Sequence, residues 1–481
     1  MTDLLDSLEP KPLWGYFLAL SRIPRGSKHE AAAAAWVAEQ ARALGCEVER
    51  DAAGNVLARK PGSPGREGRP AVALQAHVDM VCEKNEGTHH DFLADPIDVV
   101  RDGDLLRARG TTLGADNGVG VAAALAVLAA RGVPHPPVEV LITVDEETGL
   151  TGAAGVRPGW LRATRLLNLD SEEEGELTIG CAGGVDTVAT RRLALVAAAP
   201  GRKALRLRVL GLKGGHSGID IDAGRANALK VLAQVLEALR GHDLELAGLR
   251  GGNKRNAIPR EASAVIRVAP AREAVLREDV ARLEREWRMA YGALDPGLAL
   301  ALEPAPAERV LSGPDARALV GLLLAAPHGV EAMSPDIRGL VQTSTNLGLA
   351  EVRGEVAEVC FLTRSSIDAS KQALAARTAA VCALAGFEAT HSGGYPGWKP
   401  EPGAALVRLV DGAHRDLFGK PMVVKAIHAG LECGLIGERY PGLEMASIGP
   451  TMKDVHTPDE HVSIPSVAAF WRLLLGILER A

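Results

Sequence analysis

The sequence predicts an α/β fold with a mostly parallel sheet, sandwiched by helices and interrupted by an inserted α+β domain. Residues 1–185 alternate short apolar runs with helix-like stretches, the pattern of a parallel sheet covered on both faces. β-branched and Arg-rich runs replace this pattern over residues 186–388, and the first pattern returns over residues 389–481. Because a chain of 481 residues is too long for one ordinary core, we expect two domains with these boundaries, the first of them discontinuous.

The spacing of apolar residues places the elements of the first segment. Alanine-rich Glu30–Leu44 and apolar Gly118–Ala130 predict helices. Short, fully apolar runs predict buried strands at Ala71–Ala76, Val138–Val144 and Leu166–Leu169.

The same patterns place the elements that follow. In the inserted segment, strands are predicted at Ala204–Leu210, Ala262–Val268 and Val356–Leu362, with a helix at Ala226–Leu239. After this segment, a helix is predicted near Gly403–Leu417 and a strand at Leu443–Ile448.

Charge and composition favour a small-molecule partner. The net charge is -6 and no block of Lys or Arg indicates a phosphate-tracking face, so we expect no nucleic-acid partner. The N-terminal MTDLLDSLEP has the wrong order for a secretory signal, and no apolar run reaches membrane-spanning length. Six scattered cysteines without a CxxC pair argue against disulfides and thiolate zinc sites, so we expect a reduced cytoplasm and no membrane contact.

Ionisable residues follow three of the predicted strands at once. His77 and Asp79 follow the first strand, Asp145-Glu146-Glu147 the second, and Asp170 the third. Because ligands in open α/β sheets gather outside the carboxyl ends of the strands, we expect these groups to meet at one edge. His77 and Asp79 share a face, so Asp79 can accept a hydrogen bond from His77 and fix its tautomer.

A bound metal cation would offset the negative charge of these acids. Carboxylates packed at one sheet edge repel one another unless cations offset their charge. Histidines and carboxylates without thiolates suit Zn²⁺, and also Mn²⁺ or Co²⁺. The alternatives at this point are a packed or capping His77 and a solvated loop for Asp145–Glu147.

The stretch Gly114–Gly120, GADNGVG, is a turn that leads into an apolar helix. Without other information, Asp116 can equally be an N-cap between flexible glycines. A dinucleotide cradle is disfavoured because no strand precedes the glycines and no complete GxGxxG occurs.

Eight ordered segments together resemble a known superfamily, the co-catalytic zinc aminopeptidases and carboxypeptidases, and more narrowly its aminoacyl-histidine dipeptidase (Xaa-His dipeptidase, peptidase D) branch. The resemblance spans nearly the whole chain. The segments are HVDMVCEKN (77–85), GADNGVG (114–120), VDEETGLTGA (144–153), NLDSEEEGELTIGCAGG (168–184), KGGHSGIDI (213–221), GGNKRNAIPRE (251–261), GLECG (430–434) and VHTPDE (455–460).

The resemblance implies a complete two-metal site. It makes Asp116 the bridging ligand, His77 and Asp170 the other ligands of one ion, and Glu147 and His456 those of the second. It makes Glu146 the general base that takes a proton from the attacking water. It also implies a strained or cis peptide after Asp116. Neighbouring side chains at a strand end point apart, so we expect Glu146 to act as the base while the adjacent Glu147 binds metal.

The resemblance also implies residues that act from the inserted domain, which corresponds to a lid or dimerisation domain. His216 matches a lid histidine that stabilises the oxyanion, with a turn histidine as the plain alternative. Arg364 matches an arginine that clamps the substrate carboxylate, with a surface ion pair as the alternative. Asn256 matches a substrate-contacting asparagine, and Gly430 and Glu432 a pocket loop near the second metal.

The resulting hypothesis is a di-zinc dipeptidase that cleaves unblocked dipeptides and favours those of the Xaa-His type, with a homodimer as the expected assembly. A tripeptide aminopeptidase or an N-acyl amino acid deacylase on the same scaffold is the nearest rival, since metal ligands do not set the substrate class. A non-catalytic metal-dependent binding or assembly protein is the rival from another class. Retention of Glu146 argues against it, because a structural metal site needs no spare base.

Overall fold

The computed structural model describes residues 2–481, which form two compact units. Unit 1 contains the residues up to Gly180 together with Trp398–Ala426 and Leu431–Ala481. Unit 2 contains Cys181–Gly397 and the short segment Ile427–Gly430. The chain therefore leaves unit 1 once for a long excursion and once for a short one.

Unit 1 is built on a twisted mixed sheet with the strand order β1-β2-β6-β3-β7-β23-β8-β22. Its strands are β1 (Glu47–Arg50), β2 (Val56–Lys60), β3 (Val72–His77), β6 (Val138–Thr143), β7 (Arg165–Asn168), β8 (Glu176–Cys181), β22 (Val423–Ile427) and β23 (Glu444–Ser447). A smaller antiparallel sheet contains β4 (Val99–Asp102), β5 (Leu105–Ala108), β24 (Met452–Lys453) and β25 (His461–Ser463).

The four central strands of the larger sheet, β6, β3, β7 and β23, run parallel, whereas β1, β2 and β8 pair antiparallel. Every residue of β3 and β6 is buried, as expected for strands covered on both faces. The helices of this unit are α1 (Thr2–Asp6), α2 (Lys11–Leu20), α3 (Ala31–Ala43), α4 (Ala115–Ala129), α5 (Glu146–Gly149), α6 (Thr151–Gly155), α11 (Ala405–Phe418), α12 (Glu432–Arg439) and α13 (Ile464–Arg480).

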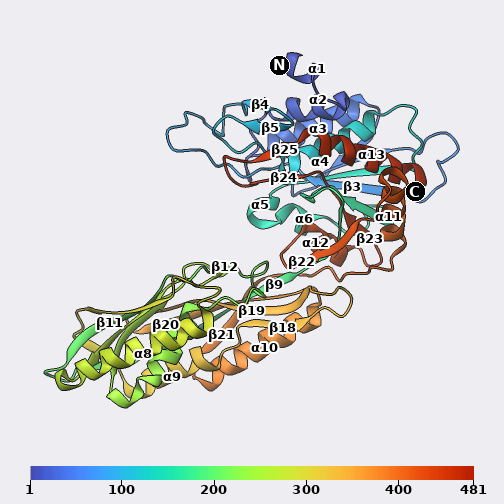
Figure 1. Ribbon diagram of the computed structural model, residues 1–481. Coiled ribbons are helices and arrows are strands. Elements are labelled where there is room, and N and C mark those ends of the chain that lie inside the picture. Colours follow the sequence, from blue (N-terminus) through green and yellow to red (C-terminus); the bar gives the residue numbers. More distant parts are fainter. Residues whose placement is uncertain (1) are drawn as a thin grey trace. The chain divides into compact units, whose positions relative to one another are not determined.

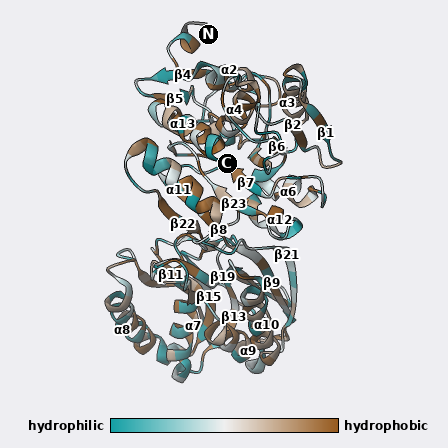
Figure 2. Cartoon of the chain, turned by 90° about the vertical axis from the view of Figure 1, so that its right-hand side faces the viewer, coloured by the Kyte–Doolittle hydropathy of each residue, from teal (hydrophilic) through white to brown (hydrophobic). Residues whose placement is uncertain are grey.

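Helices cover both faces of this sheet. In Figure 1, α3 and α4 lie on one side of β3, and α6 and α12 lie on the other. Helix α11 is striped teal and brown in Figure 2, because its buried face carries Leu406, Val407 and Val410 while charged residues face outward. The carboxyl ends of the central strands are left for polar loops.

Unit 2 is an antiparallel sheet with helices on one face, which Figure 1 shows for α8, α9 and α10. Its strand order is β16-β11-β15-β13-β19-β20-β9-β21, with β18 beside β19. The strands are β9 (Gly183–Arg192), β11 (Lys203–Leu210), β13 (Glu245–Gly251), β15 (Ala262–Val268), β16 (Ala299–Pro304), β18 (Gly329–Met333), β19 (Val341–Arg353), β20 (Val356–Ser365) and β21 (Glu388–Tyr395). Two small pairs are β10 (Leu195–Ala197) with β17 (Arg309–Leu311) and β12 (Gly215–His216) with β14 (Ala257–Ile258).

The helices of unit 2 pack on the sheet through alternate strand residues. They are α7 (Ala228–Ala238), α8 (Glu273–Tyr291), α9 (Gly313–Ala325) and α10 (Asp368–Leu384). Leu205, Leu207 and Val209 of β11 point into the core that these helices close. The residues between them, such as Arg206 and Arg208, therefore lie on the opposite, uncovered face.

The predicted elements agree with the observed ones to within three residues at their ends, with two differences near the polar edge. Asp116 and Asn117 have non-helical backbone angles, so the regular part of α4 starts at Gly118. The expectation that Glu146 and Glu147 lie at a strand end is wrong. Asp145 has a positive φ of 51°, which turns the chain away from β6 and starts α5 at Glu146.

Among residues 2–481, no helix combines the length and the hydrophobicity that a membrane crossing requires.

A close approach behind the polar edge gives a test of this packing. A Cβ at Gly152 of α6 would lie 2.3 Å from the carbonyl oxygen of Val144 and 2.6 Å from its nitrogen. Because backbone cannot give way as a flexible side chain does, Gly152→Ala should destabilise unit 1 by about 1–3 kcal/mol and lower its melting temperature. Gly15→Ala in α2 is the matched control, since nothing lies within 4 Å of the added carbon. Equal melting temperatures for the two variants would contradict the packing.

Candidate functional site

Five sequence-predicted ligands meet at the carboxyl edge of the central strands. His77 is the last residue of β3, and Asp170 follows β7 by two residues. Asp116 lies in the first turn of α4 and Glu147 in α5, and His456 lies in the loop between β24 and β25. The strand topology thus brings together residues that are up to 379 positions apart.

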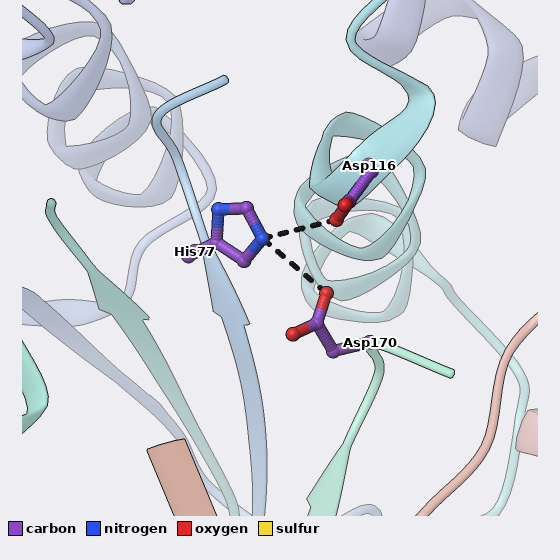
Figure 3. A group of neighbouring side chains, drawn as sticks. All are labelled: His77, Asp116 and Asp170. Carbon is purple, nitrogen blue, oxygen red and sulfur yellow. Dashed lines mark hydrogen bonds and ion pairs between the residues drawn. The ribbon is translucent and has the colours of Figure 1, made fainter. Parts of the chain in front are cut away.

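The carboxylate of Asp116 lies between the two histidines. Its Oδ1 is 3.1 Å from Nε2 of His77, and its Oδ2 is 3.2 Å from Nε2 of His456. Asp170 Oδ1 is 3.3 Å from the same nitrogen of His77, as Figure 3 shows. Glu147 Oε2 is 3.1 Å from Nε2 of His456. One carboxylate therefore serves two adjacent groups of ligands.

Two groups of potential ligands share Asp116, and in each the ligand atoms lie within 4.8 Å of one another. These groups are His77, Asp116 and Asp170, and Asp116, Glu147 and His456. His77, Glu146 and Glu147 form a further group that satisfies the same distance, so geometry alone does not remove Glu146 from the ligands. The peptide bond between Asp116 and Asn117 is cis.

The side chains of this edge fit a divalent cation. Glu147 Oε1 is buried without a hydrogen-bond partner among the described residues, an arrangement that costs free energy unless a cation is bound. The hydrogen bonds that His456 donates to the carboxylates of Asp116 and Glu147 raise the pKa of His456 to about 11, so the pocket favours positive charge. Imidazole and carboxylate donors without thiolates suit Zn²⁺, Mn²⁺ and Co²⁺.

Asp79 braces both sides of the candidate metal centre. Its Oδ1 lies 3.3 Å from Nδ1 of His77 and accepts a hydrogen bond from the backbone N–H of Glu146 at 3.0 Å. Its Oδ2 accepts from the N–H of Glu147 at 3.2 Å and from Ser27 Oγ at 2.7 Å. Despite burial, which raises it, the pKa of Asp79 falls to about 2, because these donors favour the ionised form. Asp79 therefore orients His77 and the start of α5 together.

Glu460 holds the loop that carries Asp116, a role that the sequence did not reveal. Its two carboxylate oxygens accept hydrogen bonds from four consecutive backbone N–H groups, at 2.7 to 3.3 Å. These donors are Leu113, Gly114, Ala115 and Asp116. The residue stands in the motif VHTPDE, four positions after His456, so one short segment supplies both a predicted ligand and this anchor.

Arg25, which no motif indicated, ties two ligand-bearing loops together. The buried guanidinium donates to the carbonyl oxygens of Val78 and Asp79 at 3.0 and 3.2 Å and to that of Gly114 at 2.5 Å. It therefore links the end of β3 to the loop before Asp116. No local sequence pattern marks a residue whose partners are distant backbone carbonyls.

Glu146, the predicted base, sits among other acids. Burial raises its pKa well above the ordinary value, and the nearby carboxylates of Asp170, Glu432 and Glu147 raise it further. A carboxylate with a raised pKa is a stronger base, which is the property that proton abstraction requires. A bound cation lowers this pKa again, because it offsets the negative charge of the neighbours.

Glu432, predicted in a substrate-pocket loop, points into the sheet. Its Oε2 accepts hydrogen bonds from Gln75 Nε2 at 2.6 Å and Thr143 Oγ1 at 2.8 Å, and burial raises its pKa to about 7. Gln75 in turn accepts from Asn168 Nδ2 at 2.6 Å. The carboxyl thus belongs to a polar layer that crosses β6, β3 and β7 beneath the candidate metal centre.

Within unit 2, Arg364 lies in a second polar cluster. The guanidinium is buried and has no carboxylate partner among the described residues. It donates to Tyr395 Oη at 2.9 Å and to Ser217 Oγ at 3.3 Å. Because a buried, unpaired cation is costly, the cluster is suited to an anionic group of a ligand. The surface ion pair considered for Arg364 is not what the structure has.

His216 lies on β12, directly before Ser217 of this cluster. Its Nδ1 accepts hydrogen bonds from the N–H groups of Gly218 and Ile219, at 3.2 and 3.1 Å, so Nε2 carries the proton of the neutral ring. Burial and the nearby Arg364 lower the pKa of His216, which keeps the ring neutral. The ring therefore presents one N–H donor.

The other predicted residues of this unit lie close by. The backbone carbonyl oxygen of Asn256 accepts a hydrogen bond from the N–H of Ser217 at 2.8 Å, next to His216. Asn256 itself is exposed. Gly430 lies against the ring of Tyr395, which a Cβ would approach to 3.0 Å. His428, assigned no role from the sequence, contacts Ser344 Oγ through Nε2 at 2.7 Å, and burial lowers its pKa to about 3.

The anchoring role of Glu460 predicts the effect of removing it. Glu460→Ala should leave four buried N–H groups without acceptors and loosen Asp116, so metal affinity should fall by about 10–100-fold in a chelator-competition titration. Glu460→Gln keeps one acceptor oxygen, so its metal affinity should lie between that of the wild type and that of Glu460→Ala. Exposed Glu86→Ala is the matched control. Wild-type affinity in Glu460→Ala would contradict the role.

Comparisons with known proteins agree with these motifs. A model of peptidase family M20/M25/M40 matches residues 73–480. The chain is 43% identical over 480 residues to the cytosol non-specific dipeptidase of Escherichia coli (strain K12), covering 99% of this chain and 98% of the relative. The crystal structure of aminoacylhistidine dipeptidase from Vibrio alginolyticus superposes with a TM-score of 0.93 at 41% identity, covering 100% of this chain and 99% of that chain.

More distant structures share the fold. Aminopeptidase PepT from Bacillus cereus ATCC 10987 superposes with a TM-score of 0.60 at 16% identity, over 98% of this chain and 99% of that one. The α/β fold class and the resemblance inferred from the ordered motifs are thereby confirmed. The chain belongs to peptidase family M20/M25/M40.

Proposed function

We propose that this protein hydrolyses unblocked dipeptides with two divalent cations, Zn²⁺ in the first instance, and that Xaa-His dipeptides of the β-alanyl-histidine type are favoured substrates. One observation carries the two-metal part: the two oxygens of the Asp116 carboxylate face two different histidines, at 3.1 and 3.2 Å. A carboxylate placed in this way is suited to bridge two cations.

The ligand assignment follows the two groups that share Asp116. His77 and Asp170 would hold one cation together with Asp116, and Glu147 and His456 would hold the other. Mn²⁺ and Co²⁺ suit the same donors. When bound, the cations polarise the scissile carbonyl and lower the pKa of water.

Glu146 acts as the general base in this proposal. It accepts a proton from the attacking water and then delivers it to the leaving amine nitrogen, so the carboxylate is regenerated. The raised pKa of this buried carboxyl favours the first transfer. Asp79 supports the reaction as a positioning residue, because it holds the backbone of Glu146 and the ring of His77 at once.

Unit 2 supplies the substrate-facing groups. The N–H donor of His216 stabilises the oxyanion, and the guanidinium of Arg364 binds the terminal carboxylate. Asn256 and Gly430 contact the substrate in the same proposal. We propose unit 2, which contains the expected residues 186–388, as the lid or dimerisation domain, and unit 1, which contains most of residues 1–185 and 389–481, as the catalytic domain. His216 acts either within its own chain or across a homodimer.

The names of two relatives support the substrate class. One is a non-specific dipeptidase and the other an aminoacylhistidine dipeptidase, each matched over nearly its whole length at more than 40% identity. The name of the first also supports a cytoplasmic location. A small peptide is therefore the proposed partner.

Removal of the base separates catalysis from metal binding. Glu146→Ala should retain both metal ions while its kcat falls by about 10²–10⁴-fold, since only proton transfer is lost. Glu147→Ala, a change of the same size at the adjacent residue, should lose metal instead. Metal analysis and dipeptide hydrolysis on the same preparations check both outcomes. Unchanged turnover in Glu146→Ala would refute its role as base, and loss of metal would make it a ligand.

A substrate panel tests the proposed specificity. Unblocked dipeptides, β-alanyl-histidine among them, should be cleaved with higher kcat/KM than tripeptides, N-acetyl amino acids or dipeptide amides. The amides lack the carboxylate that Arg364 binds, so they should have a higher KM as well as a lower kcat than the unblocked dipeptides. Preference for N-acetylated substrates would mean a deacylase, and preference for tripeptides an aminopeptidase.

A further inference from the structure

A cavity lies on the uncovered face of the unit 2 sheet. It has a volume of about 650 Å³, within the usual range for small-molecule sites. Its lining includes four arginines, Arg206, Arg208, Arg250 and Arg260, and two acids. No residue proposed above for catalysis or metal binding is among those that line it.

Strand register explains why the arginines surround a hollow. Arg208 of β11 pairs with Ser263 of β15, and Ser263 pairs with Arg250 of β13. Cross-strand partners point to the same face, so two long arginines flank one small serine. In the adjacent row, Arg206 pairs with Val265, which pairs with Gly248. Small residues such as Ser263 and Gly248 therefore form the bottom of the cavity, and the long arginine side chains form its walls; we call this cavity the bowl.

The bowl carries unbalanced positive charge. Among the described residues, Arg208 is the one arginine of the four with an ion pair, to Glu303 at 3.2 Å. Of the two acids that line the cavity, Glu351 is paired with Arg353 at 2.7 Å, which leaves Glu261. Arg208 and Arg250 are two strand spacings apart, about 10 Å at the backbone, so their charges repel. An anion would offset this repulsion.

We propose that this cavity binds a small tetrahedral oxyanion, such as the phosphate group of a metabolite. Arg206, Arg208 and Arg250 converge on it from two strands, and Arg260 contributes from the rim. Guanidinium groups donate paired hydrogen bonds to phosphate oxygens, and a tetrahedral anion accepts from several directions at once, unlike a planar carboxylate. Ser263 adds a hydroxyl donor at the floor.

The rim connects this site to the loop of His216. Gly215, the residue before His216, lines the cavity, and so do Ala257 and Ile258 of the strand that pairs with it. The side chain of Arg260 lies over Gly214, where a Cβ would approach its Cγ to 2.4 Å. An anion held by Arg260 therefore lies next to the backbone that orients His216.

Calorimetric titration of the full-length protein with inorganic phosphate, at constant ionic strength and fixed metal content, tests the proposal. Each lost charge-assisted hydrogen bond changes the dissociation constant by about tenfold. Arg206→Gln/Arg250→Gln should therefore weaken phosphate binding at least tenfold. Arg285→Gln/Arg338→Gln removes the same charge from exposed arginines outside the cavity and should bind phosphate as the wild type does.

Glu261→Gln gives a change in the opposite direction that misfolding cannot imitate. Removing this negative charge from the cavity wall should tighten phosphate binding severalfold. Succinate in place of phosphate should bind more weakly to the wild type if the tetrahedral geometry matters. Absence of phosphate binding to the wild type, or equal affinity in the Arg206→Gln/Arg250→Gln protein, would overturn the proposal.

Discussion

The structure of unit 1 depends on one constraint, the burial of the Asp116 carboxylate between two histidines. His77 comes from β3 and His456 from a loop near the C-terminal end, so this contact joins distant parts of the chain. A buried carboxylate is costly unless its partners are fixed, and here the fixing is extensive. Glu460 holds the backbone on one side of Asp116, and Arg25 holds the loop before it.

The surrounding residues follow from the resulting excess of negative charge. Asp79, Glu146, Glu147 and Asp170 all lie within the same edge of the sheet, and each either contacts a donor or faces the candidate metal centre. Both oxygens of Asp79 accept hydrogen bonds, which keeps its carboxylate ionised, whereas burial among acids raises the pKa of Glu146. Two neighbouring carboxyl groups are thus given different chemical properties by their surroundings.

The sequence predicted the central strands and the meeting of their polar ends because both rest on local patterns. Apolar runs such as Val138–Val144 mark buried strands, and the sheet brings their carboxyl ends together. It missed the turn at Asp145, since a positive φ at a residue other than glycine leaves no apolar or polar periodicity. It also missed Arg25, whose partners are backbone carbonyls, and Tyr395, which meets Arg364 only after β20, β9 and β21 have paired.

Anomalous X-ray diffraction at the zinc edge, from crystals of the metal-loaded protein, tests the central claim most directly. The account predicts two anomalous peaks about 3.5–4 Å apart, with one oxygen of Asp116 coordinated to each. A single peak, or two peaks that do not share Asp116, would contradict it.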